Sequence, residues 1–246
     1  MIATLPQALT SPAISLAGRL PADQELLWFD QPAIKQSLWP STIETLLMVG
    51  CSTVATVIIG LPLGILLVAS APNGIRPAPL LNKVLGLIVN VGRSIPFIIL
   101  LFVLLPITAK VMGTTLGWRG MVFPLAVGAI PFFARLVETN LLAVERGKIE
   151  AAQMMGASRS RIMGDVIVRE ALPGIIQSIT VLIITLIGFS AMGGAVGGGG
   201  LGALAYNYGY QRYYADILLI TVIVIVLIVQ AVQVVGDMLS RHADHR

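Results

Sequence analysis

Long apolar stretches separated by short polar segments dominate this chain. Runs with few or no charged residues cover about residues 45–70, 84–109, 119–144, 172–193 and 216–237. A helix needs about 20 consecutive apolar residues to cross the hydrocarbon core of a bilayer, and each run is long enough. The pattern predicts an all-α integral membrane protein with five transmembrane helices inside residues 40–240.

Two stretches do not form a simple span. The second run contains Arg93 and Pro96, so either Arg93 lies inside the helix bundle or the span begins near Ser94. The uncharged stretch at residues 171–211 is too long for one helix. Its glycine- and tyrosine-rich part, from residue 193, predicts a reentrant or extracytoplasmic segment. Residues 1–39 contain several prolines and no sustained apolar core, which predicts a poorly defined extracytoplasmic extension.

Composition agrees with a membrane location. Only 11% of the 246 residues are charged and 56% are hydrophobic, whereas a typical soluble domain has about 25% charged residues. The single cysteine, Cys51, excludes a disulfide framework or a thiolate metal cluster, and its apolar neighbours predict a small buried packing residue. Lys and Arg are dispersed between the apolar runs, so the net charge of +4 does not indicate a nucleic-acid partner.

The placement of basic residues predicts the orientation of the chain in the membrane. Cytoplasmic loops of membrane proteins are enriched in Lys and Arg. If the loop at residues 135–169 is inside, ten basic residues are cytoplasmic: Arg76, Lys83, Arg135, Arg146, Lys148, Arg159, Arg161, Arg169, Arg241 and Arg246. Five are then outside: Arg19, Lys35, Lys110, Arg119 and Arg212. We therefore predict an extracytoplasmic N-terminus and a cytoplasmic tail at residues 241–246.

The loop at residues 146–169 has a pattern of its own. A short helix there would have a partly apolar face, formed by Ile149, Ala151, Ala152 and Met155. Gly156 permits a turn, and Ser158 can cap a second short helix. This pattern predicts a helix-turn-helix at the membrane surface, with small and flexible side chains suited to a groove on another protein.

Glu150-Ala151-Ala152 followed by Gly156 resembles the EAA loop of bacterial ABC importer permeases. The tripeptide alone is common in helices, and its position in the longest basic cytoplasmic loop is what favours the resemblance. In that family the loop forms coupling helices that fit clefts on the ATP-binding subunits. The resemblance implies that the ATPase-coupling residues are Glu150, Ala151, Ala152, Met155, Gly156, Ala157 and Ser158. The chain departs from the family pattern at Arg169, where the family has proline.

Residues 93–101, 170–174 and 188–202 are similar to segments of the permeases of D-methionine ABC transporters. The likeness covers roughly residues 40–236. It implies a location in the bacterial inner membrane, the type I importer fold, a homodimer, a dimeric ATPase and a methionine-binding lipoprotein or periplasmic protein. It also implies a permease subunit that forms a path for L- or D-methionine by alternating access. ATP and Mg would be used by the partner ATPase, because the Gly147-Lys148 pair lacks the rest of a phosphate-binding loop. We predict no enzymatic activity and no cofactor for this chain.

The glycine-rich segment at residues 193–202 admits two interpretations. Its glycines can allow close helix packing, or they can form a flexible gate. Either role would explain a run of glycines despite the conformational entropy that each glycine loses on folding. The gate hypothesis assigns the translocation path to Ser190, Ala191, Met192, Gly193, Gly194, Gly197 and Gly198. The five tyrosines between residues 206 and 214 suit either an aromatic belt at the membrane interface or a docking face for the binding protein.

Arg93 is a candidate intramembrane charge, and such charges are costly and commonly functional. Either it is buried with Glu138 as its counter-ion, or its side chain extends to the cytoplasmic interface. Other functions remain open at this stage. An ABC importer for another amino acid or a short peptide fits the same features. A secondary transporter or channel would show inverted repeats and paired ion sites, which five unequal spans do not show.

Overall fold

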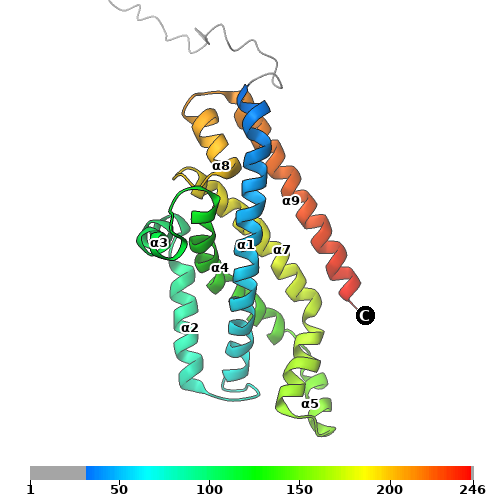
Figure 1. Ribbon diagram of the computed structural model, residues 1–246. Helices are drawn as coiled ribbons and strands as arrows, with labels where there is room; N and C mark the ends of the chain where they lie inside the picture. The colour runs from blue at the N-terminus through cyan, green and yellow to red at the C-terminus, as the bar shows by residue number, and fades with distance from the viewer. Residues whose placement is uncertain (1–31, 245–246) are drawn as a thin grey trace, which may run out of the picture.

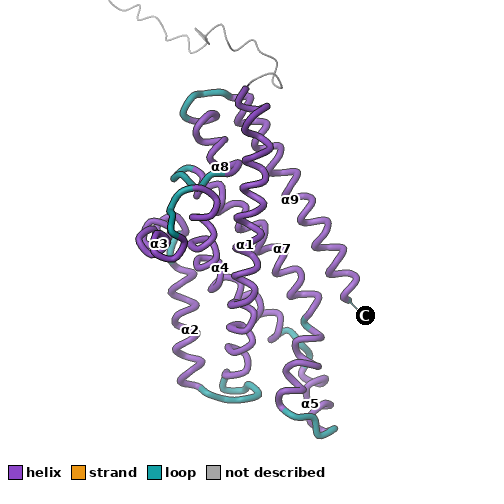
Figure 2. Tube along the Cα trace, in the orientation of Figure 1, coloured by secondary structure: helices purple, strands orange, loops and turns teal. Residues whose placement is uncertain are grey.

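The computed structural model describes residues 32–244, and all secondary structure in this range is helical (Figures 1 and 2). Most of the predicted extension at residues 1–39 and the end of the tail therefore lie outside the described residues. The α-helices are α1 (Pro32–Ser70), α2 (Pro79–Ser94), α3 (Phe97–Met112), α4 (Gly117–Leu142), α5 (Arg146–Met154), α6 (Arg159–Arg161), α7 (Leu172–Gly194), α8 (Gly200–Leu204) and α9 (Ala215–Ala243). Two short π-helices, Ile162–Val168 and Ala205–Tyr210, follow α6 and α8.

The predicted all-α membrane architecture is confirmed. Within residues 32–244, the helices α1, α4, α7 and α9 are long and apolar enough to cross a membrane. The helices α2 and α3 meet at a short break with a bend of 106°. Counted together as one broken span, they add a fifth crossing. The bent pair takes the place of the run at residues 84–109.

That second run is not one continuous helix. Ser94 ends α2, and Ile95 has an extended backbone with φ −84° and ψ 121°. Pro96 precedes the first residue of α3. A proline disfavours the helical conformation of the residue before it and has no N–H for a helical hydrogen bond, which explains the break. Arg93 consequently lies in the last turn of α2, next to a change of direction.

Helix α4 forms the centre of the bundle, with α1, α2, α3 and α7 packed around it (Figure 1). Five of its fully buried side chains recur at every fourth position: Met121, Leu125, Ala129, Phe133 and Val137, each 0% exposed. Residues four apart share one face of a helix. Between helices in lipid, association depends on close van der Waals packing, and this face supplies it.

Helix α1 contacts α4 through small residues at four-residue spacing. Ser52 and Thr56 donate hydrogen bonds to carbonyl oxygens of α4 at 3.2 and 3.4 Å. One and two turns further on are Gly60 and Gly64, and a Cβ atom at Gly64 would lie 2.7 Å from another α4 carbonyl oxygen. Because no larger side chain fits, these positions hold the two helices in direct contact.

The outer faces of α1 and α9 are apolar and exposed in the single chain. Val54, Ile58, Leu227 and Val234 are each between 55% and 66% exposed. Large exposed apolar surfaces mark contact with lipid or another protein. Cys51 is also exposed, so its predicted burial is wrong. The neighbouring residue, Ser52, is the one that faces α4, and adjacent residues on a helix point in different directions.

Candidate functional site

Residues 146–168, here called the coupling segment, form the predicted helix-turn-helix at one end of the molecule (Figure 1). After α5, Gly156 takes a left-handed conformation with φ 75°, which glycine adopts without steric cost. Ser158 then caps α6, because its hydroxyl accepts a hydrogen bond from the backbone N–H of Arg161 at 3.4 Å. Local residue choice explains this geometry.

The coupling segment has an inner and an outer face. Ile149, Ala152 and Ala157 are partly buried and pack against the main hydrophobic core. Met154 and Met155 point away and are 90% and 87% exposed. The other predicted coupling residues, Glu150, Ala151, Gly156 and Ser158, are exposed as well. The predicted apolar face is therefore divided, since Ile149 and Ala152 hold the segment while the methionines are available to a partner.

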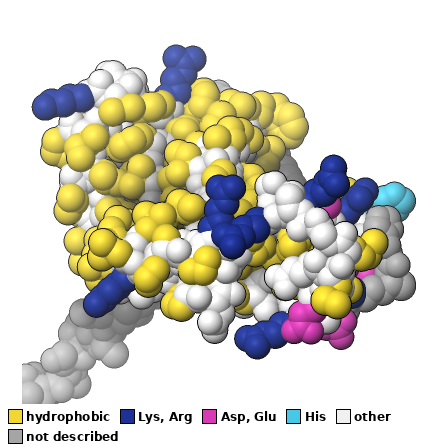
Figure 3. All heavy atoms as spheres, turned by 90° about the horizontal axis from the view of Figure 1, so that it is seen from below, with side chains coloured by type: hydrophobic (Ala, Val, Ile, Leu, Met, Phe, Trp, Pro, Cys, Tyr) yellow, Lys and Arg dark blue, Asp and Glu magenta, His cyan; other side chains and the backbone are white. Residues whose placement is uncertain are grey.

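The coupling segment is firmly joined to the bundle. Lys148 Nζ donates to a carboxylate oxygen of Glu170 across the two ends of the segment. The chain then continues in helical conformation through Arg169 into α7, with Ala171 N–H donating to the Ile167 carbonyl at 3.0 Å. Arg169, in place of the family proline, is compatible with this continuity because it retains its N–H. Figure 3 looks onto this end of the molecule and shows Lys and Arg side chains at several places on the face.

At the other end of α7, residues 193–202 form a tight turn, here called the glycine turn. A Cβ atom on Gly194 would lie 2.3 Å from Ala203 N and 2.4 Å from the carbonyl carbon of Gly202. A Cβ atom on Gly198 would lie 2.5 Å from Met121 Cγ and 2.7 Å from Gly193 O. These glycines permit close backbone approach, which accounts for them without requiring movement.

The predicted gate residues are not all placed alike. Ser190 is buried, and its hydroxyl donates to the Ile187 carbonyl at 2.7 Å. Gly193, Gly194 and Gly198 are buried within the glycine turn. Met192 is 51% exposed, Gly197 is exposed and Ala191 is partly buried. Met192 is therefore the gate candidate with a large side chain free to line a path.

Two residues that sequence reasoning missed hold the glycine turn against α1. Glu44 Oε2 accepts a hydrogen bond from Gly200 N–H at 2.7 Å, and Thr45 Oγ1 accepts one from Leu201 N–H at 2.9 Å. Both acceptors satisfy the free N–H groups at the start of α8. The sequence offered one signal, an acidic residue at the edge of the first apolar run, but 156 residues separate it from its partner.

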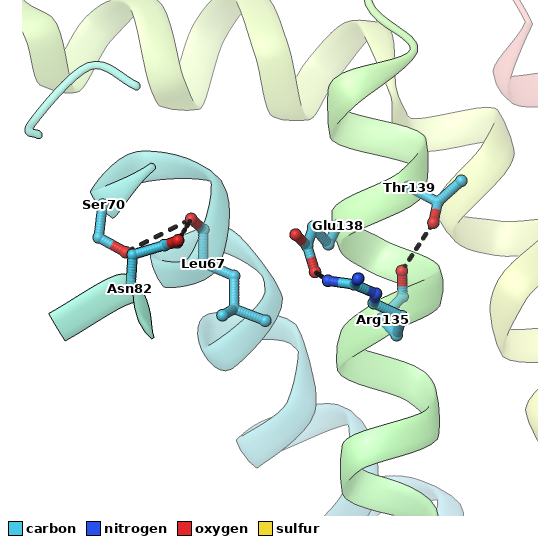
Figure 4. Close-up of polar contacts among 6 residues, drawn as sticks. All are labelled: Leu67, Ser70, Asn82, Arg135, Glu138 and Thr139. Atoms are coloured by element: carbon cyan, nitrogen blue, oxygen red, sulfur yellow. Dashed lines mark hydrogen bonds and ion pairs between the residues drawn. The ribbon is translucent and has the colours of Figure 1, made fainter. Parts of the chain in front are cut away.

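Of the two alternatives for Arg93, the structure does not show the pairing with Glu138. Glu138 instead accepts a hydrogen bond from Arg135 Nη1 at 2.6 Å, one turn away on α4 (Figure 4). Residues three apart on a helix are neighbours, so this pair forms without help from another element. Arg93 is exposed and makes no ion pair with any residue in the range 32–244.

The chain matches a family model and characterised relatives over most of its length. Residues 60–246 match the model described as "Binding-protein-dependent transport system inner membrane component". The "Probable D-methionine transport system permease protein" of Vibrio cholerae is 44% identical over 209 residues, which are 85% of this chain and 93% of the relative. The methionine import system permease protein of Bacillus subtilis is 42% identical over 85% of this chain and 94% of its own length.

A solved structure resembles this fold closely. A chain of the MetNI methionine ABC transporter, in an inward-facing conformation, superposes with a TM-score of 0.85 at 41% identity. The match covers 87% of this chain and 100% of that chain. Shared sequence, shared fold and the placed coupling segment agree, and the chain belongs to the family of binding-protein-dependent transport system inner membrane components.

Proposed function

We propose that this chain is the membrane permease subunit of an ATP-driven importer and forms the translocation path for methionine. The observation that carries the proposal is the coupling segment, whose exposed Met154 and Met155 stand at one end of the molecule. Lys148 joins this segment to Glu170, just before α7. Flexible exposed methionines suit a groove on a partner protein. The methionine relatives, at 42% to 44% identity over most of the chain, support the choice of substrate.

Helix α7 connects the two candidate sites. It begins at Leu172, shortly after the coupling segment, and ends in the glycine turn. Its 23 residues rise about 35 Å at 1.5 Å per residue. In the proposed cycle, ATP-driven closure of two ATPase subunits displaces the coupling segment, and α7 carries the displacement to Ser190, Met192 and the glycine turn. Alternating access then depends on whether the gate opens toward one side of the membrane or the other.

The proposal also assigns partners and orientation. The exposed apolar faces of α1 and α9 would meet lipid and a second copy of the chain. The coupling segment faces the cytoplasm, with the N-terminus outside and the C-terminus inside. A methionine-binding lipoprotein or periplasmic protein delivers substrate to the end that carries α8 and the exposed tyrosines. ATP and Mg are used by the ATPase partner.

Charge substitution at the exposed methionines tests the coupling role. The double variant Met154→Asp/Met155→Asp is expected to lose at least about tenfold in ATPase co-purification, because charged groups would enter an apolar contact. The matched control is Tyr213→Asp, since Tyr213 is 81% exposed in the α8–α9 connection and its left-handed backbone, φ 59°, tolerates aspartate. Equal co-purification of both variants would refute the coupling assignment.

Uptake assays separate the candidate functions. Proteoliposomes that contain this chain, the ATPase and the binding protein should accumulate radiolabelled methionine and hydrolyse ATP faster when methionine is present. Uptake that persists without the ATPase would reject the importer proposal in favour of a secondary transporter or channel. ATP-dependent uptake of another amino acid or a short peptide, without methionine uptake, would retain the importer and correct the substrate.

A further inference from the structure

A small cavity beside the break between α2 and α3 combines one cation with an apolar lining. Its volume is about 260 Å³, and the residues around it are Gly92, Arg93, Ile95, Phe97, Leu100, Gly128, Phe132, Thr185 and Phe189. These residues come from α2, α3, α4 and α7, except Ile95, which lies in the break between α2 and α3. We call it the Arg93 pocket. The lining includes Arg93 and no acidic residue.

The depth of Arg93 in the bundle explains why its charge requires a polar environment. From Pro79, at the end of the molecule that carries the coupling segment, α2 rises about 21 Å to Arg93 at 1.5 Å per residue. A hydrocarbon core is about 30 Å thick. Exposure of the guanidinium to lipid within the hydrocarbon core would be costly. An exposed arginine at this depth is suited to a water-filled path.

The aromatic part of the pocket is built with close packing. The rings of Phe97 and Phe189 stack with centroids 4.3 Å apart and planes 1° apart. Gly128 makes room for this arrangement, because a Cβ atom there would lie 3.2 Å from Phe97 and 3.3 Å from Leu100. With Phe132, the pocket presents three phenyl rings, and thioether sulfurs make favourable contacts with aromatic rings.

The pocket also adjoins the proposed gate. Phe189 directly precedes Ser190, and Met192 lies three residues further along, on the neighbouring turn of α7. One turn before Phe189, the Thr185 hydroxyl donates to the Val181 carbonyl at 2.8 Å and keeps lone pairs that can accept from an ammonium group. The guanidinium of Arg93 can thus bind a carboxylate, the Thr185 hydroxyl an ammonium group, and the phenyl rings an apolar side chain, all of one small molecule.

We infer that the Arg93 pocket is a substrate subsite on the translocation path, where Arg93 binds the carboxylate of an α-amino acid with a flexible apolar side chain. The inference rests on the proposed function and deepens it, since it places recognition of the substrate within the permease itself. Arginine pairs with carboxylates in a two-pronged geometry that a single ammonium cannot reproduce. Arg93→Lys should accordingly keep only part of the affinity.

Direct binding to the assembled transporter tests the subsite. The permease–ATPase complex, in lipid nanodiscs without the binding protein, is titrated with radiolabelled L-methionine, and methioninol, which lacks the carboxylate, serves as competitor. We expect Arg93→Gln to weaken methionine binding about 10- to 100-fold, as for loss of a charged hydrogen bond. It should also abolish the preference for methionine over methioninol. Arg119→Gln is the matched control, because Arg119 is exposed, stands over the Trp118 ring and lies outside the pocket.

The outcomes separate this inference from the proposed function. The subsite is overturned if Arg93→Gln binds methionine, and prefers it over methioninol, as strongly as the wild type does. It is also overturned if the wild-type complex takes up methionine with the binding protein but binds none without it. Loss of the permease dimer in Arg93→Gln, measured by light scattering and restored in Arg93→Lys, would show an interface role and also overturn it. A wild-type complex that neither binds nor takes up methionine would instead refute the proposed function.

Discussion

Replacing Gly194 with alanine should weaken the fold, and replacing Gly188 with alanine on the same helix should not. Both glycines lie in α7, six residues apart. A Cβ atom on Gly194 would lie 2.3 Å from Ala203 N, 2.4 Å from Gly202 C and 2.7 Å from Gly202 Cα. A Cβ atom on Gly188 would meet nothing within 4 Å. An added Cβ atom therefore meets backbone at Gly194 and open space at Gly188.

The expected magnitude follows from these distances. All three contacts at Gly194 are backbone atoms of α8, so relief requires α8 to move away from α7 and no side-chain rotation can provide it. Overpacking of a well-packed site costs about 1–3 kcal/mol, and a forced backbone shift belongs at the upper end. At Gly188, alanine has the better helix propensity by about 1 kcal/mol, which predicts unchanged or slightly higher stability.

Thermal unfolding of the detergent-solubilised permease, followed by size-exclusion chromatography with fluorescence detection, provides the measurement. For a chain of this length, about 1 kcal/mol corresponds to a shift of roughly 2–4 °C in the midpoint, so Gly194→Ala should fall several degrees below wild type. Gly188→Ala should stay within about 2 °C of wild type or rise above it. The reasoning fails if Gly194→Ala is as stable as wild type, or if both variants lose equal stability.

Two further predictions concern the two ends of α7. Glu44→Ala removes the acceptor of Gly200 N–H and should lower the free energy of unfolding by about 1.5–3 kcal/mol. Glu44→Gln keeps an acceptor and should lower it less. Equal shifts of the thermal midpoint in the two variants would contradict this prediction. Lys148 and Glu170 are 42% and 27% exposed, so reversing one charge should change stability by less than about 1 kcal/mol. Either single reversal should nevertheless leave ATP hydrolysis poorly coupled to uptake. The double reversal Lys148→Glu/Glu170→Lys should restore the coupling. If the double variant is no better coupled than the single ones, this pair has no role in coupling.

Local sequence was enough to predict much of this molecule. Each apolar run contains its own helical hydrogen bonds, and in lipid the backbone must satisfy them internally, so run length predicts spans. The coupling segment is equally local, because Gly156 and Ser158 act on backbone atoms within a few residues of themselves. Pro96 indicated the interruption of the second run, since its effect on Ile95 requires no distant partner.

Tertiary structure alone decided which distant groups meet. The sequence predicts a break at Pro96 but not its angle of 106°, which belongs to a fold in which α2 and α3 both pack against α4. Glu44 was invisible as a partner of the glycine turn, because hydrogen bonds across 156 residues leave no periodic trace in a sequence. Likewise, the sequence placed Arg93 in an apolar run, and only the fold set it in one pocket with Phe97 and Phe189. Patterns along the chain report short-range geometry, whereas the choice between competing partners is settled by distance in the packed bundle.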